Sequence, residues 1–195
     1  MAGDTRQRMI ESTAELLRSK GLAATSFTDI TERSSVPRGV IYHHFPNGKA
    51  ELVRAAVEWT GRTVVGHLES LPSTSPAGVI EAFLDSIRYV LTDSAHGASC
   101  AVAAVTVETS VADGGSQSDT SLVFEAWMRA LQRKFIDVGV ANQPAEDLAT
   151  MLLVILQGSH ILTRASGNLD AFERVSRLIR ATMIASPPGQ CLLQT

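Results

Sequence analysis

Residues 26–49 read SFTDITERSSVPRGVIYHHFPNGK, and this stretch decides the fold. Ser26 and Asp29 have the spacing of a capping box, in which two side chains satisfy the free amides at a helix start, so we expect a helix from residue 27. Ser34 and Ser35 end that helix, and Pro37 presets the backbone for the first turn of a second one. The pattern predicts two short helices joined by a tight turn.

The second short helix carries groups that suit a nucleic-acid groove. Arg38 offers a guanidinium fork, Gly39 lets the backbone approach a partner, and Tyr42 and His43 present hydrogen-bonding tips on flat rings. Lys49 stands where the free amides of the next helix would complete a phosphate site. We therefore predict that this helix docks on DNA. The alternative is a small helical corner of the surface without a partner.

Residues 6–58 resemble the DNA-binding domain of the TetR family of bacterial transcriptional repressors. Two positions depart from the family pattern. Pro37 stands where the family commonly has the serine that caps the recognition helix, and Val40 stands where it often has Ser or Thr. A valine can contact a thymine methyl group but cannot hydrogen-bond, which changes the expected base preference. The matching motifs are Gly21-Leu22, Thr25-Ser26, Asp29-Ile30, Val36, the run from Gly39 to Phe45, and Lys49.

The predicted partner of this head is double-stranded operator DNA. We assign Arg38 and Val40 to bases, and Tyr42 and His43 to the phosphate backbone. The complete predicted DNA-binding set is Ser26, Thr28, Arg38, Gly39, Val40, Tyr42, His43 and Lys49.

Composition points to a helical protein of the cytoplasm. The 195 residues are 45% hydrophobic, no secretory pattern opens the chain, and we expect no apolar run long enough to cross a bilayer. Residues 1–60 carry a net charge of +1 and the remainder −4, a balance that would weaken indiscriminate binding to DNA. Cys100 and Cys191 stand too far apart to indicate a zinc site or a disulfide framework.

Apolar residues recur at helical spacing along the whole chain, so the predicted fold class is all-α. After the head, helices are expected over residues 47–70, 77–92, 99–110, 120–138, 144–165 and 168–185, with a Gly- and Ser-rich loop over 112–119. The predicted domains are a helix-turn-helix DNA-binding domain (1–48), a connecting helix (49–71), a ligand-binding and dimerisation domain (72–186) and a flexible tail (187–195).

The body resembles one branch of the family. Residues 96–109, HGASCAVAAVTVET, are similar to a stretch of the LmrA/YxaF-like regulators, and the head residues Pro37-Arg38-Gly39 fit the same branch. Members of that branch repress genes that include multidrug exporters. The resemblance thus implies a repressor that controls an efflux or detoxification gene.

A homodimer is predicted from the two C-terminal helices. The helix over 144–165 is apolar nearly all round, which is more surface than one core can cover. Pairing both helices with their copies would form a four-helix bundle about a two-fold axis. Such a dimer would hold its two reading helices about 34–36 Å apart, one turn of DNA.

The family resemblance also implies that the body binds a small hydrophobic ligand. In that arrangement the ligand tilts the connecting helix, which the segment 99–110 presses upon, and the heads leave the spacing that DNA requires. The alternative is that the same side chains simply fill a core. The predicted ligand-binding residues are Phe83, Ile87, Phe124, Trp127, Met128, Leu131, Gln157 and His160.

No arrangement of residues favours an enzyme. Cys100 has His96 before it and Glu108 after it, but neither an oxyanion site nor a phosphate loop accompanies them, so we expect Cys100 to be a small buried hydrophobe. His43 and His44 are adjacent on a helix, where their rings should diverge and could not share a metal ion. We predict no cofactor and no metal. Two alternatives remain, a helical enzyme acting on small molecules and a structural dimer whose head no longer binds DNA.

Overall fold

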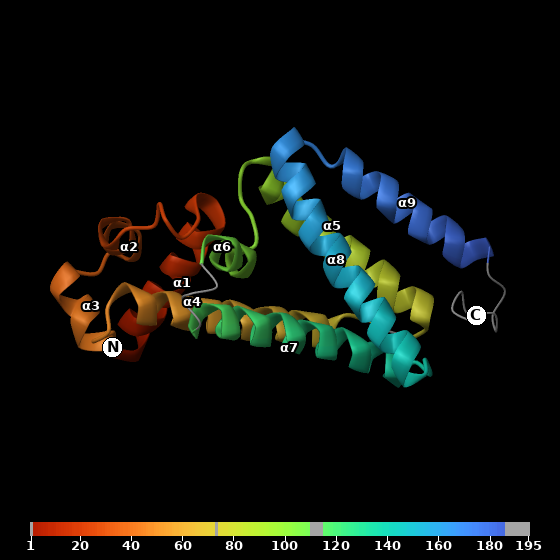
Figure 1. The fold of residues 1–195 in the computed structure, drawn as a ribbon, viewed down its shortest axis with the longest axis horizontal. Helices are drawn as coiled ribbons and strands as arrows, with labels where there is room; N and C mark the ends of the chain where they lie inside the picture. Colours follow the sequence, from red (N-terminus) through yellow and green to blue (C-terminus); the bar gives the residue numbers. More distant parts are fainter. Residues whose placement is uncertain (1, 73, 110–114, 186–195) are drawn as a thin grey trace. The chain divides into compact units, whose positions relative to one another are not determined.

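A computed structural model of the chain describes residues 2–72, 74–109 and 115–185, and its regular structure is helical throughout (Figure 1). The all-α prediction is confirmed. The helices of the described residues are α1 (Ala2–Lys20), α2 (Phe27–Ser34), α3 (Arg38–His44), α4 (Lys49–Ser70), α5 (Pro76–Ala95), α6 (Ala101–Glu108), α7 (Gly115–Asp137), α8 (Asn142–Ser166) and α9 (Asp170–Ala185).

The chain divides into two compact units. Unit 1 comprises Met1–Val65 and Ala98–Ala126, and unit 2 comprises Gly66–Gly97 and Trp127–Thr195. The division falls inside α4 and α7, so each of these helices contributes to both units. It also groups α6 with the head, whereas the predicted domains place residues 72–186 together. The predicted functional division stays a prediction, and its tail, 187–195, lies outside the described residues.

Helix boundaries follow the sequence closely, with one exception. Residues 112–119 were expected to form a loop. Residues 112–114 lie outside the described part of the chain, and α7 already begins at Gly115. Arg54 on α4 forms an ion pair with Asp119 at 2.9 Å, and Thr120 is buried, so tertiary contacts hold the first turns of α7 despite their Gly- and Ser-rich sequence. Helix α8 starts at Asn142, with Pro144 in the first turn, where its missing amide hydrogen leaves no intrahelical bond unmade.

The head of unit 1 packs around a small apolar core. Helices α1 to α4 each contribute to it, and Phe27, Val40 and Trp59 pack against its edge. Ile10 of α1 belongs to the same cluster as Ile30 and Ile41 of the helix-turn-helix. The buried members are Met9, Ile10, Leu16, Ile30, Val36, Ile41, Phe45, Leu52 and Ala55.

Two further helices complete unit 1. Helix α6 packs on α1 and buries Ala101, Val102, Ala104 and Val105, whose small side chains allow a close approach. Helix α7 lies tightly against α4 at Gly61, where an added Cβ would come within 3.0 Å of Val123. A larger residue at position 61 would therefore force these two helices apart.

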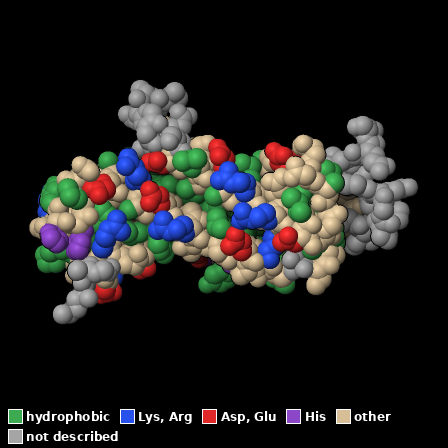
Figure 2. All heavy atoms as spheres, turned by 90° about the horizontal axis from the view of Figure 1, so that it is seen from below, with side chains coloured by type: hydrophobic (Ala, Val, Ile, Leu, Met, Phe, Trp, Pro, Cys, Tyr) green, Lys and Arg blue, Asp and Glu red, His purple; other side chains and the backbone are tan. Residues whose placement is uncertain are grey.

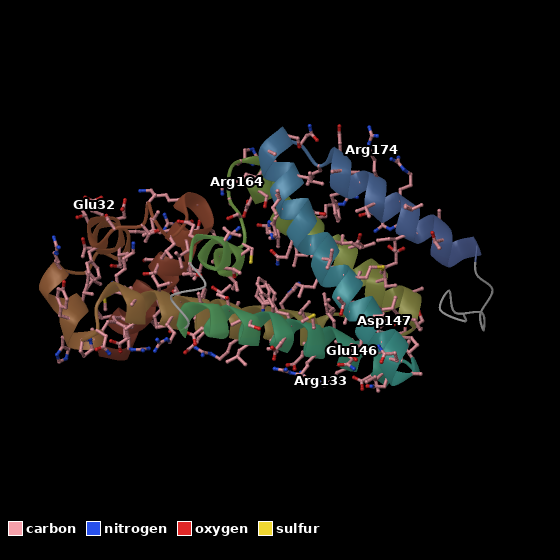
Figure 3. All side chains as sticks on the ribbon, in the orientation of Figure 1. Glu32, Arg133, Glu146, Asp147, Arg164 and Arg174 are labelled. Atoms are coloured by element: carbon pink, nitrogen blue, oxygen red, sulfur yellow. The ribbon has the colours of Figure 1, made fainter. Side chains whose placement is uncertain are left out.

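Unit 2 is built on α5, α8 and α9, which pack against one another. Apolar side chains such as Phe83, Leu84 and Phe172 fill its interior. Ion pairs link the surfaces of these helices: the half-buried Arg180 on α9 reaches Glu81 and Asp85 on α5 at 2.8 and 2.9 Å. On the outer side of α7, Arg133 points away from the helix (Figure 3), and it pairs with Glu69 at 2.8 Å. Pairs this exposed contribute little to stability.

The interior of unit 2 also holds polar groups. Ser94 on α5 and His160 on α8 are hydrogen-bonded at 2.7 Å between the Ser hydroxyl and Nδ1. Gln157, one turn earlier on α8, buries both its amide nitrogen and its amide oxygen without a hydrogen-bond partner. An unpartnered buried polar atom costs about 1–3 kcal/mol, so the Gln157 amide is an energetically unfavourable feature of the isolated chain.

Helix α8 corrects one expectation from the sequence. Its 25 residues are long and apolar enough, by length and composition alone, to cross a membrane, whereas no such segment was expected. The core helix of a globular protein can pass the same test. Here one face of α8 is buried in unit 2, while Met151, Val154, Ile161 and Leu162 on the other side are exposed.

Candidate nucleic-acid interface

The start of α2 has the predicted capping box. The Ser26 hydroxyl accepts the amide hydrogen of Asp29 at 3.2 Å, and the Asp29 carboxylate accepts that of Ser26 at 2.9 Å. Lys20, at the end of α1, forms an ion pair with the same carboxylate. The hydrogen bond from Lys20, followed by those from Ser26, holds the pKa of Asp29 well below its ordinary value of 3.8. The capping box thus also links α1 to α2.

The stability of the head should therefore depend on Asp29 in acid. Because the pKa of Asp29 is lower in the folded state, its ionised form adds stability above the ordinary pKa, and this contribution is lost as the pH falls below about 4. We expect the melting temperature of the native protein to fall more steeply below that pH than the melting temperature of Asp29→Asn. Parallel slopes in thermal melts of the two proteins would contradict this.

A tight turn aims α3 away from α2. Ser35 adopts a left-handed conformation at φ 54°. Its backbone N–H closes α2 by donating hydrogen bonds to the carbonyl oxygens of Thr31 and Glu32. Pro37 follows at the N-cap of α3 and makes no side-chain cap, so the serine cap usual in the resembling family is absent here as predicted. Residues 34–37 therefore set the direction of α3 through the backbone of the turn and through Val36, which is buried in the head core.

Helix α3 presents one polar face and one apolar face. Arg38, Gly39, Tyr42 and His43 are exposed, while Ile41 is fully buried in the head core. Figure 2 shows histidine side chains beside Lys and Arg side chains at its left end, where Figure 1 draws α3. We call this exposed stripe of Arg38, Gly39, Tyr42 and His43 the reader; its contact with DNA stays a prediction. The partial burial of Val40 against the core was not anticipated, and its contact with a base stays a prediction.

Neighbouring rings restrain the exposed side chains. The Tyr42 ring lies 5.7 Å from that of Phe27 in a tilted arrangement, so its hydroxyl end is held at the surface. The rings of His43 and His44 do not diverge as expected but meet edge to face, with centroids 5.1 Å apart. Among the described residues no group of three or more His, Cys, Asp or Glu side chains could hold a metal ion.

The flanking residues of the predicted set fall into two kinds. Ser26 and Thr28 are exposed at the start of α2, beside the reader in sequence and in the head. Lys49 is half-buried, and its ammonium group donates to the carbonyl oxygen of Leu22 at 2.9 Å. Asn47, two residues before α4, contacts that helix through its backbone and not through its side chain. Its backbone amide donates to the carboxylate of Glu51 at 2.9 Å.

Sequence reasoning missed a contact of Glu108 with the head. Glu108 ends α6, and its carboxylate accepts the backbone amides of Leu22 and Ala23 at 2.8 and 2.6 Å. Because 86 residues separate Glu108 from Leu22, no local pattern could reveal this pairing. The Glu108 carboxylate is therefore engaged by the head and is not a partner for Cys100, which is buried at the N-cap of α6.

Most of the predicted ligand-binding residues gather in unit 2. Phe83, Ile87, Trp127, Leu131 and His160 are buried there. Met128 and Gln157, also in unit 2, are partly buried, and the Met128 sulfur accepts a long hydrogen bond from Thr150 at 3.8 Å. Phe124 belongs to unit 1.

Comparisons with known proteins agree with this geometry. Residues 9–56 match the family model of bacterial regulatory proteins of the tetR family, and residues 76–178 match that of the LmrA/YxaF-like C-terminal domain of transcriptional regulators. The HTH-type transcriptional regulator Rv0196 of Mycobacterium tuberculosis is 30% identical over 94% of this chain and 96% of its own. LmrA of Bacillus subtilis is 25% identical over 91% and 95%.

A solved structure shows the same fold. The crystal structure of a TetR transcriptional regulator from Legionella pneumophila superimposes with a TM-score of 0.75 at 23% identity, over 91% of this chain and 96% of that one. The two family matches define a helix-turn-helix transcriptional regulator. The chain belongs to the TetR family and carries a C-terminal domain of the LmrA/YxaF type; it is a regulator and not an enzyme.

Proposed function

We propose that the protein is a homodimeric repressor of the cytoplasm that binds operator DNA and leaves it when a small, largely apolar ligand binds. The exposed stripe of Arg38, Gly39, Tyr42 and His43 carries the DNA-binding part of the proposal, because it places a guanidinium group and two hydrogen-bonding rings on the outer face of the second helix of a helix-turn-helix. An efflux or detoxification gene, implied by the family resemblance, is the proposed target.

Each side chain of the reader has an assigned role. Arg38 suits a bidentate contact with guanine, while Tyr42 and His43 suit phosphates. Thr28 and the first amides of α2 lie where a second phosphate can bind, and Ser26 orients them through its cap. Lys49 supports the same end of the head through Leu22, and Val40 is proposed to touch a thymine methyl group with the part of its side chain that stays exposed.

Substituting Arg38 tests the reader. Arg38→Ala should weaken operator binding by about 1–3 kcal/mol and leave non-specific binding nearly unchanged, because a base contact is lost. Arg62→Ala is the matched control: it removes an equal charge from an exposed position on α4, where Arg62 pairs with Glu58. Fluorescence anisotropy with operator and scrambled duplexes measures both. Equal loss on both duplexes would show that Arg38 contacts only phosphate.

The chemistry of unit 2 supports a neutral ligand. Among the described residues no Asp, Glu, Lys or Arg is buried, so a charged ligand in this interior would lack a counter-charge. The unpartnered amide of Gln157 offers a donor group, its NH2, and an acceptor, its carbonyl oxygen, one helical turn from His160 of the His160–Ser94 pair. A mainly apolar molecule with a carbonyl and a hydroxyl group close together would satisfy both atoms of that amide.

Release from DNA requires a ligand that distinguishes two states. The ligand must bind the released state more tightly, and about 5.5 kcal/mol of preference moves the population from 1:99 to 99:1. We propose that α4 is the lever that separates the two heads of the dimer, as the family resemblance implies. Helix α6 contacts α1 and the loop after it, and we propose that it also presses on residues 47–70 when the ligand binds.

Titration with flavonoid-like compounds tests the ligand site. Trp127 fluorescence should change on binding, in a Trp59→Phe background that removes the second tryptophan, and operator DNA should be released at the same concentrations. Gln157→Leu should weaken binding about tenfold through loss of the amide contacts, whereas Gln143→Leu, at an exposed site on the same helix, should not. Binding without DNA release, or equal affinities in both variants, would contradict the proposed site.

A further inference from the structure

The end of α1 is held at one point by the carboxylate of Glu108. After Lys20 the chain turns through Gly21, whose amide closes α1 on Leu17. The amides of the next two residues, Leu22 and Ala23, both donate to Glu108, one to each carboxylate oxygen. Helix α6 thus supplies the hydrogen-bond acceptor for the backbone amides of the loop after α1, although 86 residues of sequence separate Leu22 from Glu108. Hydrogen bonds to an ionised acceptor are stronger than neutral ones.

The other end of α6 holds the same part of α1. Ser99, just before the N-cap of α6, donates its backbone amide and its hydroxyl to the carbonyl oxygen of Arg18, at 2.8 and 3.2 Å. Arg18 lies in the last turn of α1, where carbonyl groups lack intrahelical donors. Helix α6 therefore donates to α1 at its beginning and accepts from the following loop at its end.

The steric requirements at Gly21 agree with this arrangement. Gly21 has φ +81°, a conformation that side chains rarely adopt, and an added Cβ would lie 2.3 Å from Oε1 of Glu108. Glycine is therefore required for the turn and for the close approach of the carboxylate. The carbonyl group of Leu22 is held as well, by the ammonium group of Lys49.

The fixed loop leads directly into the reader. Thr25 donates its hydroxyl to the carbonyl oxygen of Gly21 at 2.6 Å, and the next residue, Ser26, is the cap of α2. The position of α2 sets that of α3 through the turn at residues 34–37. A displacement of about 1 Å at a recognition surface is enough to impair contacts that need close alignment.

We propose that α6 is a component of the DNA-binding unit and that Glu108 is a positioning residue of the reader, acting through the amides of Leu22 and Ala23. The residues that match the family's DNA-binding model, 9–56, then form an incomplete reader, because one of its supports comes from the segment that matches the C-terminal domain model. The inference rests on operator binding by the head and on no property of the ligand.

The sign of the charge effect makes the test sharp. Removing a carboxylate makes the protein more positive, which by itself strengthens binding to DNA. Glu108→Ala should nevertheless weaken operator binding about tenfold, because two charge-assisted hydrogen bonds are lost. Glu58→Ala is the control: it removes the same charge from an exposed site of unit 1 whose partner is Arg62, and it should bind operator as tightly as the native protein or slightly more tightly.

Operator affinity is measured by fluorescence anisotropy with the full chain, and amide hydrogen exchange is followed at Leu22 and Ala23. Glu108→Ala should exchange faster at these amides, and Glu108→Gln, which keeps an acceptor without the charge, should recover part of the affinity. If Glu108→Ala proves unstable at the assay temperature, Glu108→Gln decides alone. It should bind operator more weakly than Glu58→Ala does, but more tightly than the native protein binds a scrambled duplex. Native operator affinity or native exchange in these Glu108 variants overturns the inference, whereas failure of the native protein to bind any operator overturns the proposed function.

Discussion

Replacing Val154 by arginine should convert the proposed dimer to a monomer and weaken operator binding about 100-fold or more. Val154 is 65% exposed and Ile161 68% exposed on α8, and with Leu162 they form an apolar stripe along one side of the helix. Gly158 lies within this stripe, where an added Cβ would meet no atom within 4 Å, so a second helix could approach closely. A charge buried in such an interface lacks a partner and costs several kcal/mol.

DNA binding weakens because a monomer contacts the operator with one head, whereas the proposed dimer contacts it with two. Joining two binding modules strengthens the overall affinity by about 10² to 10⁴, and a monomer forfeits that gain. Sedimentation at micromolar concentration measures the mass, and anisotropy measures the affinity. Tyr89→Arg is the control, because Tyr89 is 80% exposed on α5, away from the stripe on α8. A Val154→Arg protein that stays dimeric would place the interface elsewhere.

Replacing Phe45 by alanine should lower the free energy of unfolding of the head by about 3–5 kcal/mol. Phe45 is fully buried in a core of few residues, and the guanidinium group of Arg6 lies 4.9 Å from its ring centroid. A small core cannot collapse around so large a cavity. Operator binding should be lost with the fold of α3, because Phe45 follows α3 directly and its side chain packs in the same core cluster as Ile41 of α3.

Tyr42→Ala separates stability from recognition. Tyr42 is 52% exposed on the same helix, so its removal should weaken DNA binding while the unfolding free energy changes by less than about 1 kcal/mol. Urea denaturation followed by Trp59 fluorescence, in a Trp127→Phe background, reports on the head core against which Trp59 packs. Equal destabilisation by both substitutions would mean that Tyr42 belongs to the core and not to the reader.

The parts of the fold that the sequence predicts are those set by short-range rules. The capping box at Ser26, the proline before α3 and the alternation of Ile41 with exposed neighbours are all local patterns, and each has the predicted geometry. The start of α7 could not be predicted in the same way. There the pairing of Arg54 with Asp119 holds a helix where composition favours a loop.

In the reader, too, some features follow from local sequence patterns and others from contacts between distant residues. Its exposed stripe follows from helical periodicity, but the environment of its supports depends on contacts between distant residues. Val40 faces partly inward because α3 lies flat on the head core, and the Lys49 ammonium group is engaged by Leu22. Glu108 carries no signal in the sequence, since a carboxylate at a helix end is usually a solvated charge.

Protection of the DNA that flanks the protein's own gene tests the central claim most directly. A footprint with the purified protein should show two inverted half-sites whose centres lie about 34–36 Å apart, one turn of the double helix, and the protection should persist in excess non-specific DNA. Protection that vanishes in competitor DNA, or that shows no preferred sequence, would contradict the assignment of this chain as an operator-binding repressor.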